Sequence, residues 1–311
     1  MTIKTNHPGI PEKNVDRRKF IGNLTKAAGS AMLAFPLVAK AKNILQQPHF
    51  WTVGEIMDLF IKEVPGAPFK NTVDTLKAGS RDIKVSGIVT TMFATLEVIQ
   101  KTIALNANFI IAHEPTFYNH LDDTSWLEHD DVYRFKADLL KKHKIAVWRN
   151  HDYIHRLTSD GVRSGVVSRL KWEAYSIKGN PNVFEIPDMD LKRLIAHVKE
   201  HLGIDSLRFI GDISQPCKRI LLMPGASGGK NQITAITREK PDVLVCGEIQ
   251  EWETAEYIRD ANTKGQKISL VVLGHVASEE PGSEFMAAWI NEKVKGVFAT
   301  HVPAGNSLMS A

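Results

Sequence analysis

The chain has 311 residues, of which 43% are apolar and 24% are charged, and its formal net charge is +4. This composition excludes wholesale disorder, and the absence of an 18-residue apolar run excludes an ordinary membrane span. Two cysteines are too few for a disulfide framework or for a zinc site built from cysteine alone. The length suits one large or two small domains.

The positive charge is concentrated in residues 1–41, which hold seven basic and two acidic residues. Arg17 and Arg18 precede a modest apolar run that ends in the small-residue pattern Ala39-Lys40-Ala41. This order predicts a signal peptide of the twin-arginine type over residues 1–41, and therefore export to the periplasm or another extracytoplasmic space. An amphipathic N-terminal helix that stays attached is the alternative.

Removal of the signal would leave about 270 residues with a net charge of about −1. This near-neutral balance and the lack of a basic stripe argue against nucleic-acid binding. Export would bring Cys217 and Cys246 into an oxidising environment. Cys246, however, lies in an apolar run that is typical of a buried thiol.

Helical periodicity and short apolar runs alternate through the first half of the remaining chain. The segment from residue 50 to 178 is expected to form an N-terminal α/β region. Its predicted elements are a helix over 51–64, a strand over 82–89, a helix over 96–105, a strand over 109–112, a helix over 131–142 and a strand over 145–148.

The same alternation continues in the second half, after a connector and helix over 179–204. A C-terminal α/β region is expected over 205–311. Its predicted elements are strands over 219–223, 242–246, 268–273 and 296–300, helices over 253–261 and 283–293, and a glycine-rich turn over 224–229. Strands that alternate with helices predict an α/β fold with largely parallel sheets.

Three polar clusters each follow an apolar strand, and ligands in α/β folds bind beyond the carboxyl ends of strands. The clusters can therefore converge although they are far apart in the sequence. Imidazoles and carboxylates are the ligand set for Zn, Fe, Mn or Ni, and six donors exceed the need of one tetrahedral zinc. Two divalent ions that share a carboxylate bridge are expected. The six candidate ligands are His113, Glu114, His151, His155, His275 and Glu279.

Each cluster also has a purely structural interpretation. His113 and Glu114 could cap a turn, and His151 with His155 could be a surface pair on one helix face. Glu279 could simply be solvated. The shared position after strands favours the metal interpretation over these alternatives.

Five segments resemble, in order, the NIF3-like dinuclear-metal proteins of the DUF34 family, which include GTP cyclohydrolase 1 type 2 homologs. They spread over residues 50–311. The resemblance implies a NIF3-like fold of two related α/β domains with mixed, largely parallel sheets, a metal cleft between them and a toroidal homohexamer. The segments are 109–118, 151–155, 225–229, 242–248 and 273–279.

The resemblance carries the metal ligands over residue by residue, with two departures. Glu114 stands where most members have a second histidine, and His155 stands where the family has an aspartate. The two changes leave the number of imidazoles and carboxylates unaltered. An exchange of ligands across one site is expected, which predicts that Glu114 and His155 are neighbours. A changed metal preference or a lost second site are the alternatives.

A metal-dependent hydrolase acting on a small molecule, nucleotide-like or otherwise bearing phosphate or amide groups, is the expected function. Glu248 and His120 are expected to assist proton transfer, or in the case of Glu248 to orient a ligand. A metal-binding or metal-handling oligomer without turnover is the alternative. The run Pro224 to Lys230 lacks the Walker pattern, so it predicts a tight turn rather than a phosphate loop.

Overall fold

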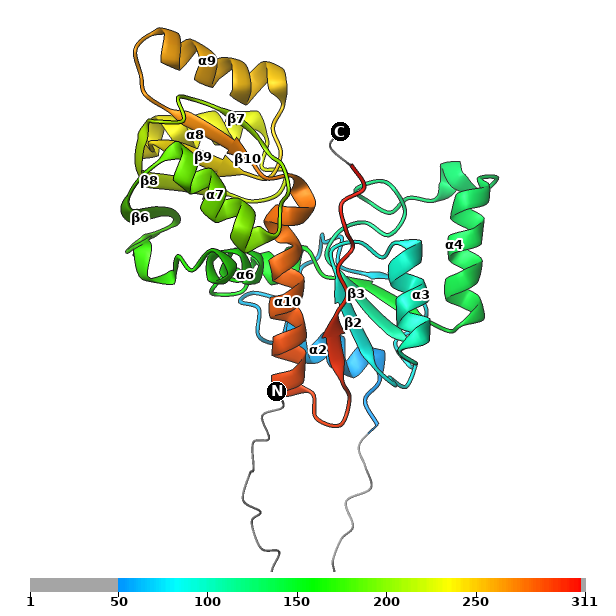
Figure 1. Cartoon of the computed structure of the whole chain (residues 1–311). Helices are drawn as coiled ribbons and strands as arrows, with labels where there is room; N and C mark the ends of the chain where they lie inside the picture. Colours follow the sequence, from blue (N-terminus) through cyan, green and yellow to red (C-terminus); the bar gives the residue numbers. More distant parts are fainter. Residues whose placement is uncertain (1–49, 309–311) are drawn as a thin grey trace, which may run out of the picture. The chain divides into compact units, whose positions relative to one another are not determined.

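The computed structural model describes residues 50–308, so the predicted signal peptide lies outside the described residues. Helices and strands alternate through this stretch and build two mixed sheets (Figure 1). The predicted α/β class is thereby confirmed. Within residues 50–308, no helix combines the length and the apolar character needed to cross a membrane.

The first sheet has the strand order β1-β4-β3-β2-β11. Strand β1 runs antiparallel to β4, and all other neighbours are parallel. Alternate strand residues pack against helices on opposite faces, α2 and α10 on one and α3 and α4 on the other. The bounds are β1 Leu76–Ala78, β2 Ile88–Thr91, β3 Phe109–Ala112, β4 Ala146–Arg149, β11 Ala299–His301, α2 Val53–Ile61, α3 Leu96–Ala104, α4 Asp131–Lys142 and α10 His275–Lys293.

The second sheet has the order β5-β6-β8-β9-β10-β7, in which only β8, β9 and β10 are mutually parallel. Helices α6 and α7 cover one face, and α8 and α9 cover the other. The bounds are β5 Ser176–Ile177, β6 Asn180–Asp190, β7 Arg208–Ile210, β8 Pro216–Met223, β9 Val243–Cys246, β10 Ser269–Val272, α6 Gly161–Leu170, α7 Leu191–Leu202, α8 Gly229–Glu239 and α9 Glu256–Thr263.

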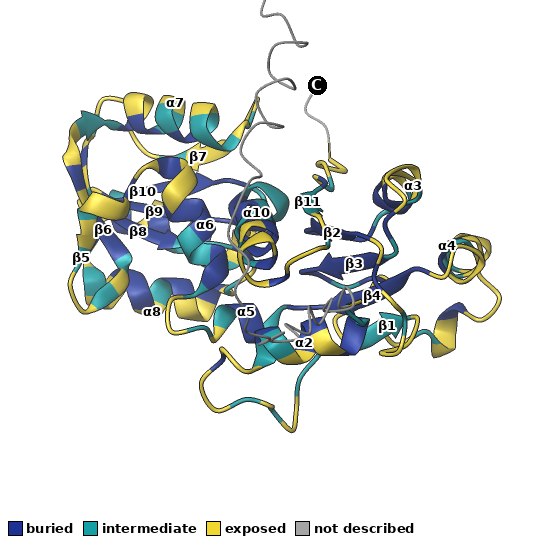
Figure 2. Cartoon of the chain, turned by 90° about the horizontal axis from the view of Figure 1, so that it is seen from below, coloured by how far each residue is buried: buried dark blue, intermediate teal, exposed yellow. Residues whose placement is uncertain are grey.

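Short helical turns complete the described chain. They are η1 Ser125–Leu127, α5 Asp152–His155, η2 Glu173–Tyr175 and the π-helical turn η3 Glu251–Ala255. The central strands of both sheets are buried on both faces (Figure 2). The sequences of β3, β4, β9 and β10 are therefore nearly continuous apolar runs, which is why they were recognisable from the sequence. Strand β2 contains two threonines and spans 88–91 rather than the predicted 82–89.

Helix ends follow the capping residues in the sequence. Asp130 accepts a hydrogen bond from the Tyr133 amide at 2.8 Å and begins α4, and Asp190 does the same for α7 with the Arg193 amide. Gly203 closes α7 in the left-handed region at φ 65°, where glycine has no steric penalty. Helix α4 matches its predicted range of 131–142, and α7 lies within the connector and helix predicted over 179–204.

Helix α10 ties the two sheets together. It begins directly after β10 of the second sheet and buries Met286 and Ile290 in the core of the first. The Thr90 hydroxyl in β2 donates to the Ser283 carbonyl at 2.6 Å. The chain then forms β11, which pairs with β2 (Figure 1). The last strand, predicted over 296–300 within the C-terminal region, thus belongs to the first sheet.

Several elements differ from the predicted ones. Helix α10 starts at His275 rather than near residue 283, because Pro281 lies inside the helix, where a proline usually indicates a break. The predicted connector holds the strand β6, whose prolines and polar residues hide its pairing. The short strands β1 and β7 were not predicted. The domain boundaries at residues 178 and 205 stay a prediction.

The two cysteines are both free and buried, Cys217 in β8 and Cys246 in β9. Burial raises the pKa of each thiol to about 12. Each therefore stays protonated at neutral pH and behaves as a small apolar side chain.

Candidate metal centre

The six predicted ligands come together at one point between the two sheets. His113 and Glu114 follow β3, His151 begins and His155 ends the short turn α5 after β4, and His275 and Glu279 occupy the first turns of α10. Donor atoms of two triads lie within 4.8 Å of one another, and the triads share His113. The triads are His113, His151 and His155, and His113, Glu114 and Glu279.

All four imidazoles share one pattern of contacts. Each Nδ1 lies within hydrogen-bonding distance of an oxygen acceptor, which leaves each Nε2 directed at the cluster. Such outer contacts fix the ring and the tautomer of a metal-binding histidine. The Nδ1 contacts are His113 to the Asn150 carbonyl at 3.2 Å, His151 to Asp152 at 3.0 Å, His155 to Asp160 at 3.1 Å and His275 to Glu248 at 2.9 Å.

Glu279 is the central carboxylate. Its Oε2 lies 3.3 Å from His113 Nε2 and 2.9 Å from His275 Nε2, and its Oε1 lies 4.0 Å from His155 Nε2. The two oxygens thus face different histidines, the arrangement of a bridging carboxylate. The side chain is 5% exposed, so water does not compensate its charge.

The chemistry of these donors fits a divalent cation. His113 Nε2 is buried and makes no hydrogen bond of good geometry, even though Glu279 approaches it. A buried nitrogen without a partner costs free energy unless a proton or a metal ion satisfies it. Imidazole nitrogens and carboxylate oxygens together favour Zn, Fe, Mn or Ni over Ca or Mg.

Protonation states at the cluster follow from burial and from the mutual attraction of its groups. Burial lowers the pKa of His275, but hydrogen bonds to Glu114 and Glu279 outweigh this effect and raise it to about 10. Burial would raise the pKa of Glu279, but His113 and His275 hold it well below its usual range. Burial, reinforced by His113, lowers the pKa of His151 to about 4.

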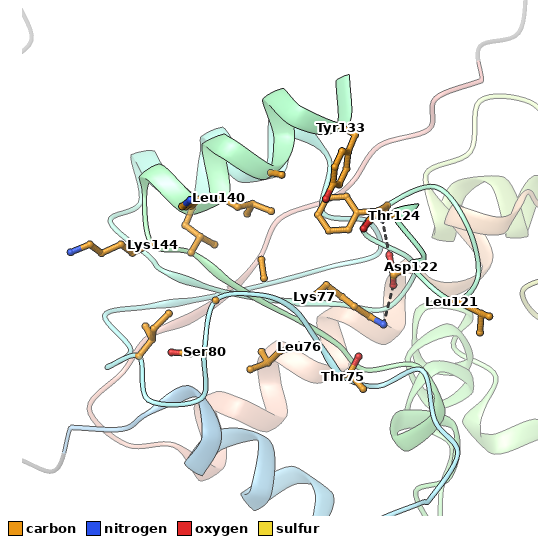
Figure 3. A pocket seen from close by; sticks show the side chains of 17 residues that line it. Thr75, Leu76, Lys77, Ser80, Leu121, Asp122, Thr124, Tyr133, Leu140 and Lys144 are labelled. Carbon is orange, nitrogen blue, oxygen red and sulfur yellow. Dashed lines mark hydrogen bonds and ion pairs between the residues drawn. The ribbon is translucent and has the colours of Figure 1, made fainter. Parts of the chain in front are cut away.

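Glu114 is held by a buried arginine. Arg149 is fully buried, and its Nη2 donates to Glu114 Oε2 at 3.1 Å. Its Nη1 donates to the His120 carbonyl and lies 3.7 Å from Asp122, which in turn pairs with Lys77 at 3.2 Å (Figure 3). Positive and negative side chains therefore alternate from Lys77 to Glu114. Because Oε2 of Glu114 is bound by Arg149, its Oε1 faces His275, at 3.2 Å.

The predicted exchange between Glu114 and His155 lies within one cluster. Both residues are neighbours of His151: Glu114 Oε1 is 3.9 Å from its Nε2, and His155 belongs to the same triad of donors. The arrangement is compatible with one site that retains its ligand inventory. The exchange itself stays a prediction.

The two residues predicted to assist proton transfer lie at the edge of the cluster. Glu248 is half-exposed, and its Oε1 contacts His275 Nδ1, so it orients that ring. His120 is exposed, and its ring centroid lies 6.3 Å from that of His151. Among residues 50–308, no hydrogen bond occupies the ring nitrogens of His120.

The glycine-rich turn supports Glu279 rather than a phosphate. A Cβ atom at Gly225, whose φ is +65°, would lie 2.1 Å from Glu279 Oε1. The Gly225 amide donates to Ser278 Oγ at 2.9 Å, one residue before Glu279. The glycine is needed because the Glu279 carboxylate packs directly on the backbone.

Two residues that position the cluster were not predicted. Asp74 is buried and accepts hydrogen bonds from the amides of His151, Asp152 and Tyr153, which holds the turn that carries His151 and His155. Arg149 directly follows the strand predicted over 145–148 and holds Glu114. Neither has a local sequence signal, since each acts on a segment that tertiary structure brings to it.

The close approach of Gly225 predicts a selective loss of metal affinity. Gly225→Ala and Gly228→Ala both place a side chain at positive φ, and each is expected to lose about 1 kcal/mol of stability. Only Gly225→Ala displaces Glu279, because nothing lies within 4 Å of a Cβ at Gly228. Zinc affinity, measured by competition with a chelator, should fall about 10- to 100-fold for Gly225→Ala alone. Equal affinities in both variants would contradict this placement of Glu279.

The pairing of Glu114 with Arg149 predicts energetic coupling. Glu114→His leaves a buried guanidinium without its closest carboxylate and should cost about 2–4 kcal/mol in urea unfolding. The loss of unfolding free energy caused by Arg149→Met should be at least about 1 kcal/mol smaller in the Glu114→His variant than in the wild type. The matched control is Glu248→His at the half-exposed carboxylate, expected to change stability by less than about 0.5 kcal/mol. Strict additivity of the two substitutions would show that the pair is uncoupled.

Comparison with known proteins gives relatives with the same fold. The GTP cyclohydrolase 1 type 2 homologs of Clostridium acetobutylicum and Clostridium perfringens are 26% and 24% identical, over 68% and 71% of this chain and 79% and 82% of theirs. Solved structures of a Staphylococcus aureus hypothetical protein and of a Bacillus cereus protein related to NIF3 superpose with TM-scores of 0.66 and 0.65. They are 20% and 16% identical to the chain, of which they cover 82% and 84%, with 97% and 99% of their own lengths matched.

These structural neighbours confirm the predicted fold of two α/β units with mixed sheets. The family model described as Duf34/NIF3 (NGG1p interacting factor 3) matches residues 69–304, which include every ligand of the candidate centre. The match extends over most of the chain. This protein belongs to the Duf34/NIF3 family.

Proposed function

We propose that this protein is a metal-dependent hydrolase that holds two divalent ions at the cluster and acts on a small molecule. One observation carries the proposal: four histidines, each fixed through Nδ1, direct Nε2 at two buried carboxylates. A purely structural cluster would have no need for four rings that all turn Nε2 toward the same carboxylates.

The ligands divide between the two oxygens of Glu279. His155 faces Oε1, with His151 beside it in the same triad, and His275 faces Oε2 together with Glu114. His113 belongs to both triads. Two bound ions would lower the pKa of a shared water and polarise the electrophile of the substrate.

The protein's own side chains would then position and relay protons. Glu248 fixes the ring of His275 through Nδ1. His120 has free ring nitrogens among the described residues and lines the cavity beside the cluster, so it is assigned the proton transfer to the leaving group. Arg149 holds Glu114 in one orientation through the 3.1 Å ion pair.

The cavity sets the size of the substrate. It has a volume of about 940 Å³ and is lined by Glu114, His151, His275 and Glu279, which is sufficient for a nucleotide-sized molecule. The names of the two clostridial relatives suggest a GTP-like substrate. Export through the leader at residues 1–41, also part of this proposal, would remove the protein from cytoplasmic GTP and favours another small molecule.

A metal-binding oligomer without turnover is the second candidate. The histidine-rich donor set fits storage or structural use of a metal ion as well as it fits catalysis. A homohexamer belongs to both proposals, and mass photometry of the purified chain tests it directly.

The two candidates are separated by metal content and activity. His275→Ala is expected to reduce the metal content from about two ions per chain to one or fewer and any hydrolytic activity at least about 100-fold, since His275 is proposed to be a direct ligand. His143→Ala, an exposed histidine on α4's end, is the control. Elemental analysis and a screen of phosphoester, nucleotide and amide substrates supply the two measurements. Stoichiometric metal without activity that depends on His275 would leave only the second candidate.

A further inference from the structure

The cavity beside the metal cluster has a second polar wall that the proposed chemistry does not use. This wall is formed by residues of the loop after β3 and of the helix α4. The segment of residues 304–307 closes another side. The unused wall contains Lys136 from the helix and Thr116 from the loop.

Lys136 is a buried ammonium without an ion pair. It is only 5% exposed, and its Nζ donates to the Thr116 carbonyl at 2.6 Å. Among residues 50–308, no carboxylate lies within 4.0 Å of Nζ. The rings of Phe117 and Tyr118 lie 5.7 and 5.2 Å away and offer only a weak cation–π attraction.

Most of the free-energy cost of burying the charged ammonium is therefore not offset by its neighbours. Burial lowers the pKa of Lys136 to about 8, and the distant charges of Asp122 and Glu97 offset this only in part. A lysine has three N–H donors, and the described residues occupy one of them. The remaining donors and the uncompensated charge are available to a ligand.

Thr116 supplies an independent observation. Its side chain is 1% exposed, and its hydroxyl is buried without a hydrogen-bond partner. An unsatisfied buried hydroxyl is destabilising, so its persistence needs a reason. The residue lines the same cavity as Lys136. It also lies two positions after Glu114, so its backbone is at most about 7 Å from that of a metal ligand.

We propose that Lys136 and Thr116 form an anion subsite that binds an oxyanion group, phosphate or carboxylate, of the small molecule processed at the metal cluster. The ammonium supplies a point charge and the threonine hydroxyl a second donor. This inference rests on the proposed function only in that the same molecule is taken to react at the metal cluster. The substrate is accordingly an anionic small molecule.

Direct binding of small anions tests the subsite without any turnover. Inorganic phosphate and acetate are titrated calorimetrically at pH 7 into the full-length protein, both metal-loaded and after treatment with a chelator. Lys136→Met, which keeps the apolar stem, is expected to weaken binding of the preferred anion at least tenfold in both forms. Lys142→Met removes an exposed charge from the same helix and should leave the affinity unchanged.

Thr116→Val separates the subsite from a structural role. The change is isosteric and removes a hydroxyl that has no partner, so the melting temperature should stay equal or rise. Anion affinity should nevertheless fall severalfold. Unaltered affinity in Lys136→Met, or binding of neither anion by the wild type, overturns the proposal. If Lys136→Met does not fold, the anion affinities of Thr116→Val and Lys136→Arg test the proposal instead. Lys136→Arg keeps the positive charge and should therefore keep most of the affinity.

Failure of the proposed function gives a different pattern. His275→Ala would then leave hydrolysis or metal content unaffected, whereas anion binding to the chelator-treated protein would still depend on Lys136. Conversely, His275→Ala could lose metal while anion binding does not depend on Lys136. That result would overturn the subsite and leave the proposed function standing. Which anion binds more tightly identifies the group on the substrate.

Discussion

Two carboxylates, Glu114 and Glu279, are buried where an uncompensated charge would cost several kcal/mol, and the surrounding structure supplies the compensation. Arg149 neutralises one of them from inside the first sheet, and His275 contacts both from α10. The remaining imidazoles approach from the carboxyl ends of β3 and β4. The buried charges of Glu114 and Glu279 therefore require that β3, β4 and α10 meet at this point, because these elements bring the groups that compensate them. A divalent cation would complete the compensation that protons otherwise provide.

Much of the fold and of the cluster could be predicted from the sequence because the signals are local. Most of the buried parallel strands are nearly continuous apolar runs. Capping residues mark helix ends, with Asp130 before α4 and Asp190 and Gly203 on either side of α7. The histidines could be grouped because each follows such a strand. The start of α10 could not be predicted, since Pro281 hides a helix that tertiary packing sustains. Strand β11 could not be assigned to its sheet, because three residues carry no information about their partner.

The supporting residues were beyond prediction for a physical reason. Asp74 and Arg149 each act on a loop or side chain from another segment, and nothing in their immediate neighbours distinguishes them from ordinary polar residues. Lys136 is one lysine among several on an amphipathic helix, and only its burial makes it unusual. The glycine at 225 was visible as part of a turn, but its purpose depends on a carboxylate brought to it from α10.

The return of the chain to the first sheet through α10 and β11 has a consequence for biosynthesis. A nascent chain that has emerged as far as β10 possesses His113, His151 and His155 but neither His275 nor Glu279. Glu279 and the edge strand β11 are synthesised after every other donor residue and every other strand of the first sheet. Neither the donor cluster nor the first sheet can therefore be completed before α10 and β11 have left the ribosome. Any ion that needs Glu279 or His275 as a ligand could bind only after this step.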